Sequence, residues 1–475
     1  MIARVERRST VWAMGLLTAY AIVVAPTLGQ PLLESHAYRQ TQTAFTGLLF
    51  AERGIDLLRP PLPILGPPGV LPLEFPLFQA MGSLVIDAGI PADLAMRLTG
   101  LACFLASAAL LFLLVRSVVG ALGAVVALAA YVFNGHALLY GRASLIEYLA
   151  VAGGLGFMLL ASRWLDTRSR AAWVGALIAG SIGVLVKVTT GAFYVLPILL
   201  WRSPTGRWGF QRPSAWALVA LVAAVGFAWS AHADDIRGSQ PATEFLATRN
   251  QYGWLFGSLA QRLDPASWRL PLVALLALTG SGLVLWAIAA VRSTRHHRQR
   301  PFLLATVALG VAAPLTFFNL YVIHDYYWAA VAPVLALGIG AGAVWLASLW
   351  PVRWARLASV GLAGAWIATL VGTLPSWSGA YGDPADFART ERVAGFISEH
   401  SDADDWVVVD GFGWNSAFLY YARRQGFAVP DESTVQDTSN LDVDAILADR
   451  VYGPFIRCEP VGTCSVSDAW VPSDP

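Results

Sequence analysis

The sequence predicts an α-helical polytopic membrane protein, with about eleven transmembrane helices, juxtamembrane helices in an outer loop and a small α/β domain at its carboxyl end. Of its 475 residues, 56% are hydrophobic and only 13% are charged, a composition that excludes a soluble chain of this length. Long apolar runs recur as far as residue 374, and the sequence from residue 381 is mixed in charge. With a formal net charge of +1, the chain lacks the positive electrostatic potential that attracts a nucleic acid, so no nucleic-acid partner is expected.

Eleven apolar runs are predicted to cross the bilayer, because about 20 helical residues span its hydrocarbon core. The first run follows Arg4, Arg7 and Arg8, exceeds the apolar part of a signal peptide and lacks a small-residue cleavage site, so we expect an uncleaved anchor. The sixth run is short and holds Gly191 and Pro197. The runs lie near residues 11–29, 94–116, 119–139, 145–163, 171–189, 190–202, 214–231, 270–291, 302–322, 326–347 and 356–374.

Clusters of arginine orient these helices. In an eleven-span threading all six clusters lie on one side, which the positive-inside rule makes the cytoplasm. They are found at residues 4–8, 116, 163–170, 202–212, 292–300 and 353–356. The sequence therefore predicts a multi-pass protein of the inner (plasma) membrane with a cytoplasmic amino terminus. The predicted outer segments are residues 30–93, 140–144, 232–268 and 321–325, and the tail from residue 375.

Two outer regions are too large to be simple connections, and they divide the chain into a transmembrane domain, residues 1–375, and an outer domain, residues 376–475. In the first outer loop, residues 30–93, the amphipathic stretch 37–53 and the apolar run that ends at Ile90 predict helices lying in the membrane interface, with proline-rich corners between them. In the tail, Asp383-Pro384 is typical of a helix start, residues 406–410 read as a buried strand, and residues 415–425 read as a helix that Gly426 ends.

Ionisable side chains at membrane depth point to function, because burying a charge in a bilayer is costly. Lys187, the only lysine, lies towards the outer end of its predicted helix, where it could extend to the lipid headgroups or bind a buried phosphate. Arg142 and Glu147 flank the start of the fourth predicted helix and could form a structural ion pair or part of a site. His324 and Asp325, with Tyr326 and Tyr327, lie at an outer membrane edge, where an aromatic belt is the alternative interpretation.

Metal binding has weak support. Neither His296-His297 nor Cys458 with Cys464 offers a full ligand set, and Asp234-Asp235 is more typical of a solvated loop start. No metal site is therefore predicted, although a divalent cation remains possible. Cys458 and Cys464 lie close together in the polar tail, so a disulfide between them is plausible if the tail is extracytoplasmic.

One ordered set of motifs resembles a known family. The chain reads Glu34-x-His36-x-x-Arg39-Gln40, then Glu74-Phe75-Pro76-Leu77, Arg142 with Glu147, Val186-Lys187, Asn319 and His324-Asp325-Tyr326-Tyr327. This order, over residues 10 to about 350, resembles the bacterial GT-C glycosyltransferases related to the family 39 protein mannosyltransferases. The resemblance implies a polyprenyl-phosphate-linked sugar donor, reaction on the outer face, a glycan, lipid or protein acceptor, and an acidic first-loop residue as catalytic base. The chain departs from many relatives, because its first acidic residue is glutamate followed by serine, where they carry aspartate or an acidic pair.

Direct displacement of the lipid phosphate would invert the sugar anomeric centre. It needs one base for the acceptor hydroxyl and cations for the leaving phosphate. We expect Glu34 as the base and Glu74 as a second acid that orients the acceptor or aligns Arg39. A retaining route would use both carboxylates. Lys187, Arg39, Arg142 and His324 are expected as cations around the phosphate. The residues expected to bind substrate are His36, Arg39, Gln40, Arg142, Glu147, Lys187, His324, Asp325, Tyr326 and Tyr327.

Two functions of other classes remain possible. A secondary transporter would place its charges near the midplane between repeated halves, whereas this chain shows no repeat and gathers its charges at the outer edge. A noncatalytic partner in envelope polymer assembly would need no base. Release of sugar from a lipid-linked donor would distinguish the enzyme from both.

Overall fold

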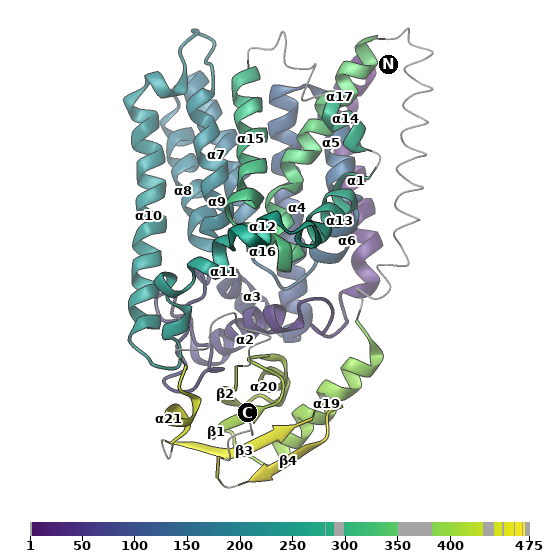
Figure 1. Cartoon of the computed structure of the whole chain (residues 1–475). Helices are drawn as coiled ribbons and strands as arrows, with labels where there is room; N and C mark the ends of the chain where they lie inside the picture. Colours follow the sequence, from purple (N-terminus) through teal and green to yellow (C-terminus); the bar gives the residue numbers. More distant parts are fainter. Residues whose placement is uncertain are drawn as a thin grey trace.

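The fold is a helical bundle with a small mixed sheet at one end (Figure 1). The computed structural model describes residues 2–280, 282–288, 299–349, 382–430, 441–448, 451–459, 461–467 and 469–470. The predicted span 356–374 and the pair His296-His297 lie outside these residues. The bundle is built from α1 (Ile2–Val24), α4 (Ala92–Val118), α5 (Ala121–Val132), α6 (Gly135–Tyr140), α7 (Glu147–Thr167), α8 (Arg170–Val186), α9 (Val188–Val195), α10 (Pro213–Gly238), α13 (Arg269–Thr279), α14 (Gly282–Ile288), α15 (Arg300–Thr316), α16 (Phe318–Ile323) and α17 (Ala332–Leu349).

Within the described residues, four segments are long and apolar enough to cross a membrane: Arg8–Thr27, Ala92–Val118, Glu147–Thr167 and Pro213–Gly238. Other predicted spans are shorter or broken. The run 119–139 is divided between α5 and α6, because Asn134 caps α6 by accepting a hydrogen bond from the backbone N–H of Ala137. The run 302–322 is likewise divided between α15 and α16. The count of eleven spans is therefore not confirmed, although the helical membrane architecture is.

The turn at Lys187 packs the two apolar helices that flank it, α8 and α9, against each other. Lys187 is extended, with φ −157° and ψ 97°, and separates α8 from α9, which packs against both α7 and α8 (Figure 1). A Cβ atom on Gly191 would lie 2.4 Å from the backbone carbon of Gly183, so only glycine permits this approach. After α9 the chain continues as a 3₁₀ helix, Leu196–Leu200. The turn holds the lysine at the end of the two helices.

The first outer loop forms two helices, α2 (Ala37–Arg53) and α3 (Leu77–Asp87). The limits of α2 are those predicted from its amphipathic pattern. Its residues Gln40 to Phe50 are all buried within the protein, and it packs against α3 and α4. The helix is thus a structural layer between the bundle and the sheet, and not an interfacial helix exposed along one face.

Between α10 and the end of the bundle, the chain forms two short helices, α11 (Tyr252–Phe256) and α12 (Leu259–Leu263). The contacts of α11 are with α16, close to the turn that carries His324. The outer segment 232–268 therefore packs over one side of this turn.

The tail is a small α/β domain, as predicted, with sheet order β2-β1-β3-β4. Strand β1 runs parallel to β2 and β3, and β3 pairs antiparallel with β4. Cys458 and Cys464 face each other across this last pair and form a disulfide. The elements are α19 (Pro384–Glu399), β1 (Trp406–Asp410), α20 (Ala417–Ala422), β2 (Gln425–Ala428), α21 (Val443–Leu447), β3 (Tyr452–Cys458) and β4 (Cys464–Ser467).

Two helix ends in the tail, the start of α19 and the end of α20, were predicted from the sequence. Helix α19 begins as predicted, because the Asp383 side chain accepts a hydrogen bond from the N–H of Ala385. The prediction that Gly426 ends the next helix is wrong. Helix α20 ends earlier, at Arg423 in the left-handed conformation, and Gly426 lies within β2. A Cβ atom there would come within 2.2 Å of the Val407 carbonyl oxygen, so the glycine permits strand pairing.

Backbone hydrogen bonds join the first outer loop to this sheet. The N–H groups of Gly426 and Ala428 donate to the carbonyls of Pro63 and Ile64, and Gly66 donates to the carbonyl of Gly426, each at 2.9 Å. The loop thus covers the edge of β2 that would otherwise expose unpaired backbone groups. The tail domain and the loop form one layer at the same end of the bundle (Figure 1).

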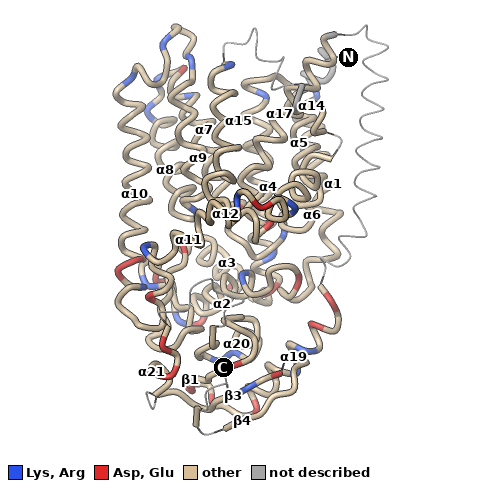
Figure 2. Tube along the Cα trace, viewed as in Figure 1, with Lys and Arg blue, Asp and Glu red and all other residues tan. Residues whose placement is uncertain are grey.

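Basic residues gather at the opposite end of the bundle, in the loops before α8 and α10 (Figure 2). This arrangement leads us to expect the sheet end outside the cytoplasm. Cysteine at Ala403, an exposed position before β1, should react with an impermeant maleimide in intact spheroplasts, and cysteine at the exposed Thr205 should react only after lysis. The unsubstituted protein is the control, because its free Cys103 is buried. Reversed labelling would contradict the orientation.

Candidate active site

The predicted site residues meet where α2 and the loop before α3 cover the outer ends of α4, α7 and α8. They do not form one group. The structure arranges them as a buried carboxylate between two arginines, a cavity lined by Arg39 and Glu74, and a polar and aromatic cluster around Asp325 and Lys187.

Glu34 lies between two arginines and is 3% exposed. Arg97 donates from its two terminal nitrogens to the two carboxylate oxygens, each at 2.5 Å, and Arg142 Nη1 lies 3.1 Å from Oε1. Both arginines are fully buried. Burial raises the pKa of Glu34, but the charges of Arg97 and Arg142 and the hydrogen bonds outweigh this effect and hold the pKa below its usual range. Glu34 is therefore an ionised structural anchor.

This geometry disagrees with the predicted role of Glu34 as base. A base must present an oxygen to the acceptor hydroxyl, and a lowered pKa weakens its affinity for the proton. Arg97 was not among the predicted site residues, although an arginine inside the apolar run 94–116 was the available signal. Arg97 also donates to the carbonyls of Gln30 and Pro31, so the cluster ties α4 to the beginning of the outer loop.

Gln40 also has a structural position. It is fully buried. Its side-chain NH₂ group donates to the Ser35 carbonyl at 3.0 Å, and its side-chain oxygen Oε1 accepts from the Ser144 N–H at 3.1 Å. These contacts join α2 to the turn before α7. The expected contact of Gln40 with substrate is therefore not supported by its surroundings.

A cavity opens between α2 and the loop that leads into α3. Its polar wall is formed by Arg39, Gln42, Thr46, Glu74 and Gln79, and its other wall by prolines and leucines of residues 60–76. The Arg39 guanidinium lies 2.5 Å from Glu74 Oε2, and the Gln79 amide donates to Glu74 Oε1 at 2.6 Å. This pairing agrees with the expectation that Glu74 aligns Arg39. Gln42 and Gln79 were not predicted, but Arg39, Gln42 and Thr46 share one helix face by their spacing.

His36 and Asp325 are brought together from segments 289 residues apart. His36 Nε2 lies 2.7 Å from Asp325 Oδ1, and the Tyr140 hydroxyl donates to the same oxygen at 2.5 Å. Burial raises the pKa of Asp325, while hydrogen bonds from His36 and Tyr140 dominate and lower it, so the carboxylate is ionised. His36 adopts a left-handed backbone conformation, φ 58° and ψ 40°, immediately before α2. That bend turns the imidazole towards Asp325.

Lys187 forms an ion pair with Glu147 and lies over two aromatic rings. Its ammonium nitrogen is 3.5 Å from the ring centre of Tyr327 and 5.1 Å from that of Tyr326. The side chain is 9% exposed. These contacts contradict the interpretation of Lys187 as a lysine that extends to the headgroups. They also contradict a structural pair between Arg142 and Glu147, because Arg142 pairs with Glu34.

His324 closes one side of this cluster. The Tyr38 hydroxyl lies 3.3 Å from His324 Nδ1, and the Trp254 ring centre of α11 lies 5.7 Å from that of the histidine. Burial, together with the charges of His36 and Lys187, lowers the pKa of His324 to about 3. This lowered pKa favours the neutral imidazole near pH 7 and argues against His324 as one of the expected cations. The imidazole can still donate or accept a hydrogen bond.

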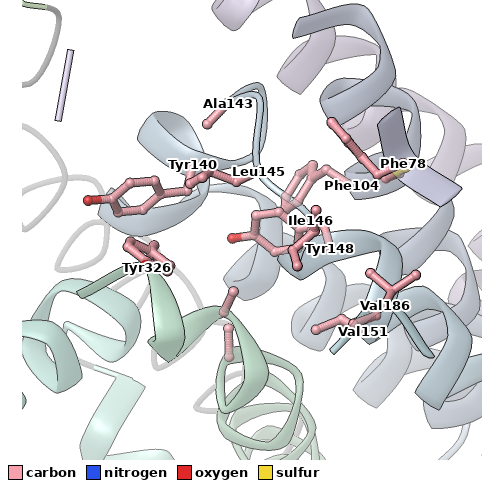
Figure 3. Packing of buried hydrophobic residues seen from close by; sticks show 14 of the residues in the cluster. Phe78, Phe104, Tyr140, Ala143, Leu145, Ile146, Tyr148, Val151, Val186 and Tyr326 are labelled. Atoms are coloured by element: carbon pink, nitrogen blue, oxygen red, sulfur yellow. The ribbon is translucent and has the colours of Figure 1, made fainter. Parts of the chain in front are cut away.

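Aromatic packing positions the cluster. Tyr326 lies below Tyr140, apart from Phe104 and Tyr148 (Figure 3). The rings of Phe104 and Tyr148 pack with their centres 4.8 Å apart. Tyr140 and Tyr326 are 6.4 Å apart between ring centres. Buried rings from α4, α6 and α7 thus support the segment that carries Asp325.

Cation binding has no assembled ligand set in the described part of the chain, where no three His, Cys, Asp or Glu side chains gather as metal ligands would. Asp234 instead accepts hydrogen bonds from Arg237 and Thr248.

No protein-family model and no curated protein sequence matches the chain. Solved structures do. ArnT from Cupriavidus metallidurans, bound to undecaprenyl phosphate, is 17% identical with a TM-score of 0.61 over 94% of this chain and 93% of that one. The oligosaccharyltransferase AglB from Archaeoglobus fulgidus, in complex with an inhibitory peptide and a dolichol-phosphate, is 13% identical with a TM-score of 0.59, over 97% and 75%.

The arabinofuranosyltransferase AftD from Mycobacteria is a third similar structure. It is 16% identical with a TM-score of 0.53, and the match covers 95% of this chain but 35% of AftD. All three proteins are GT-C glycosyltransferases. At these identities the likeness establishes the fold, and the chemistry rests on the residues of this chain.

Proposed function

From the GT-C glycosyltransferase fold, we propose that this protein transfers a sugar from a polyprenyl-phosphate-linked donor to an acceptor hydroxyl on the extracytoplasmic side of the membrane. The observation that carries the proposal is a cavity lined by a carboxylate and a guanidinium, Glu74 and Arg39, beside the Lys187 cluster. The N–H of Phe75, next to Glu74, donates to the carbonyl of Leu185 at 3.3 Å, and Leu185 lies two residues before Lys187, so the cavity and the cluster adjoin. A base and two cations are thus close together.

We assign the base to Glu74. It lines the cavity and is 9% exposed, whereas Glu34 is enclosed by Arg97 and Arg142. An inverting displacement would let Glu74 take the proton of the acceptor hydroxyl as that oxygen attacks the anomeric carbon and the lipid phosphate leaves. Asp325 is the second candidate for the base, because its side chain is 33% exposed and only its Oδ1 accepts hydrogen bonds, from His36 and Tyr140. We prefer Glu74 because it lines the cavity.

Lys187 and Arg39 are the cations suited to the leaving phosphate. The lysine ammonium has three hydrogens, so it can donate to a phosphate oxygen while it keeps its bond to Glu147. Arg39 is 14% exposed at its side chain and faces the cavity. Arg142 has no such access, because it is fully buried against Glu34.

The purified protein, reconstituted in nanodiscs, should release polyprenyl phosphate from a radiolabelled polyprenyl-phosphate sugar when an acceptor extract is added. Hydrolysis or transfer that depends on Glu74 would support the enzyme. Movement of the intact donor across a sealed bilayer without release of sugar would favour the transporter instead.

Replacement of Lys187 by methionine should weaken donor binding by about 1.5 to 3 kcal/mol, the range for a hydrogen bond to a charged group. Methionine keeps an unbranched apolar stem and removes the ammonium. The measurement is the Kd of polyprenyl phosphate for both proteins in nanodiscs of neutral lipid.

The matched control for this substitution is Lys187→Met combined with Glu147→Gln, which removes the carboxylate that the single variant leaves buried. The double variant should recover thermal stability but not donor affinity. An unchanged Kd in both variants would show that the Lys187–Glu147 pair has only a structural role.

A further inference from the structure

A line of hydrogen bonds along the cavity wall ends in an unused donor and an unused acceptor. It runs from Gln42 to Arg39, then to Glu74 and Gln79, with nitrogen–oxygen distances of 3.2, 2.5 and 2.6 Å. Gln42 and Gln79 are 2% and 4% exposed. Gln42 Nε2 and Gln79 Oε1 have no hydrogen-bond partner among the residues that the structure describes.

The chemistry of the inner neighbours determines how both amides are turned. Arg39 only donates, so Gln42 must present its oxygen to Arg39 and keep its NH₂ group free. Glu74 as a carboxylate only accepts, so Gln79 must present its NH₂ group and keep its oxygen free. Buried polar groups are nearly always hydrogen-bonded in folded proteins. Both unsatisfied atoms belong to side chains that line one cavity, so hydroxyl groups bound there can satisfy them.

We propose that this cavity is a subsite for a sugar hydroxyl, with Gln42 and Gln79 as the residues that recognise it. A hydroxyl accepts from the Gln42 NH₂ group and donates to the Gln79 carbonyl. A phosphate only accepts and would also meet the Glu74 carboxylate, and a cation would meet Arg39. The apolar wall of prolines and leucines from residues 60–76 suits the C–H face of a sugar ring.

The identity of the ligand as a sugar rests on the proposed function. The hydroxyl could belong to the transferred sugar or to a glycan acceptor, and both present the same chemistry. Its neighbour Glu74 is the proposed base, so an acceptor hydroxyl bound here would lie beside the group that takes its proton.

Gln42→Glu is the sharpest test, because it keeps an oxygen that accepts from Arg39 and replaces the free NH₂ donor by a carboxylate oxygen that cannot donate. The control below carries the same change of charge. The full-length protein in nanodiscs would be titrated with methyl α-mannopyranoside, methyl α-glucopyranoside and methyl α-arabinofuranoside, with binding followed by saturation-transfer NMR. We expect at least one glycoside to bind the unsubstituted protein, and Gln42→Glu to weaken it about tenfold or more, since sites built around a hydroxyl discriminate strongly. Gln79→Met should weaken it similarly.

The control is Gln211→Glu, an exposed position before α10 at the opposite end of the bundle, where the glutamine oxygen accepts from the Trp208 N–H at 2.9 Å. It should bind as the unsubstituted protein does. Steady-state kinetics of Gln42→Glu and Gln79→Met then show whether the hydroxyl belongs to the transferred sugar or to the acceptor. A raised KM for the lipid-linked donor assigns it to the transferred sugar, and a raised KM for the acceptor assigns it to the acceptor.

The proposal is overturned if none of the three glycosides binds the unsubstituted protein, or if Gln42→Glu and Gln79→Met both bind like the control. Failure of the proposed function gives a different result, because glycosides would still bind while no polyprenyl phosphate is released from the donor.

Discussion

Glu74→Gln is expected to lower kcat for sugar transfer by about 10²- to 10⁴-fold, the usual contribution of a positioned base. Glutamine has nearly the same volume and can still accept from Arg39, but it cannot take the acceptor proton. Arg39 is 14% exposed at its side chain and can still donate to the glutamine oxygen, so the variant should fold, with a lower Tm. The measurement is single-turnover release of polyprenyl phosphate, with thermal unfolding recorded on the same preparation.

Asp325→Asn is the matched control for this loss, because Asp325 is the other partly exposed acid near the site and asparagine keeps an acceptor for Tyr140. We expect a smaller loss of kcat than in Glu74→Gln, through poorer positioning of His36. Near-normal turnover in Glu74→Gln together with an inactive Asp325→Asn would transfer the role of base to Asp325.

Glu34→Gln is expected to reduce the free energy of unfolding by about 3 to 5 kcal/mol, the usual cost of removing one partner from a buried ion pair. Glutamine would leave the fully buried guanidinium groups of Arg97 and Arg142 without a counter-charge. A lower Tm and a smaller yield of folded protein in detergent would show the effect. Arg97→Met should destabilise the protein comparably, because it leaves the carboxylate buried beside Arg142 alone.

The control is Glu52→Gln, which breaks an exposed pair with Arg423 at 3.4 Å and should change stability by less than about 1 kcal/mol. The same variants separate the two roles proposed for Glu34. A Glu34→Gln protein with a normal Tm and no transfer would restore Glu34 as the base and remove Glu74 from that role.

The sequence by itself determined the class of the fold and much of its local structure. Its composition and apolar runs predicted a helical membrane protein, the amphipathic pattern predicted α2 at Ala37–Arg53, and the apolar run Trp406–Asp410 predicted β1. These features depend on periodicity and hydropathy within a few residues, so they can be read without knowledge of distant contacts. The motifs also indicated which segments form the site.

Only the tertiary structure decided how the charges are paired. Glu34 meets Arg97 from 63 positions away, Lys187 meets Glu147 from 40, and His36 meets Asp325 from 289. From the sequence, a pair between Arg142 and Glu147 was one of two open alternatives, because they are neighbours on the chain. A charge buried in a low-dielectric interior is held by whichever counter-charge the packing of the helices brings within hydrogen-bond distance, and that packing separates Glu34, an anchor, from Glu74, which faces the cavity.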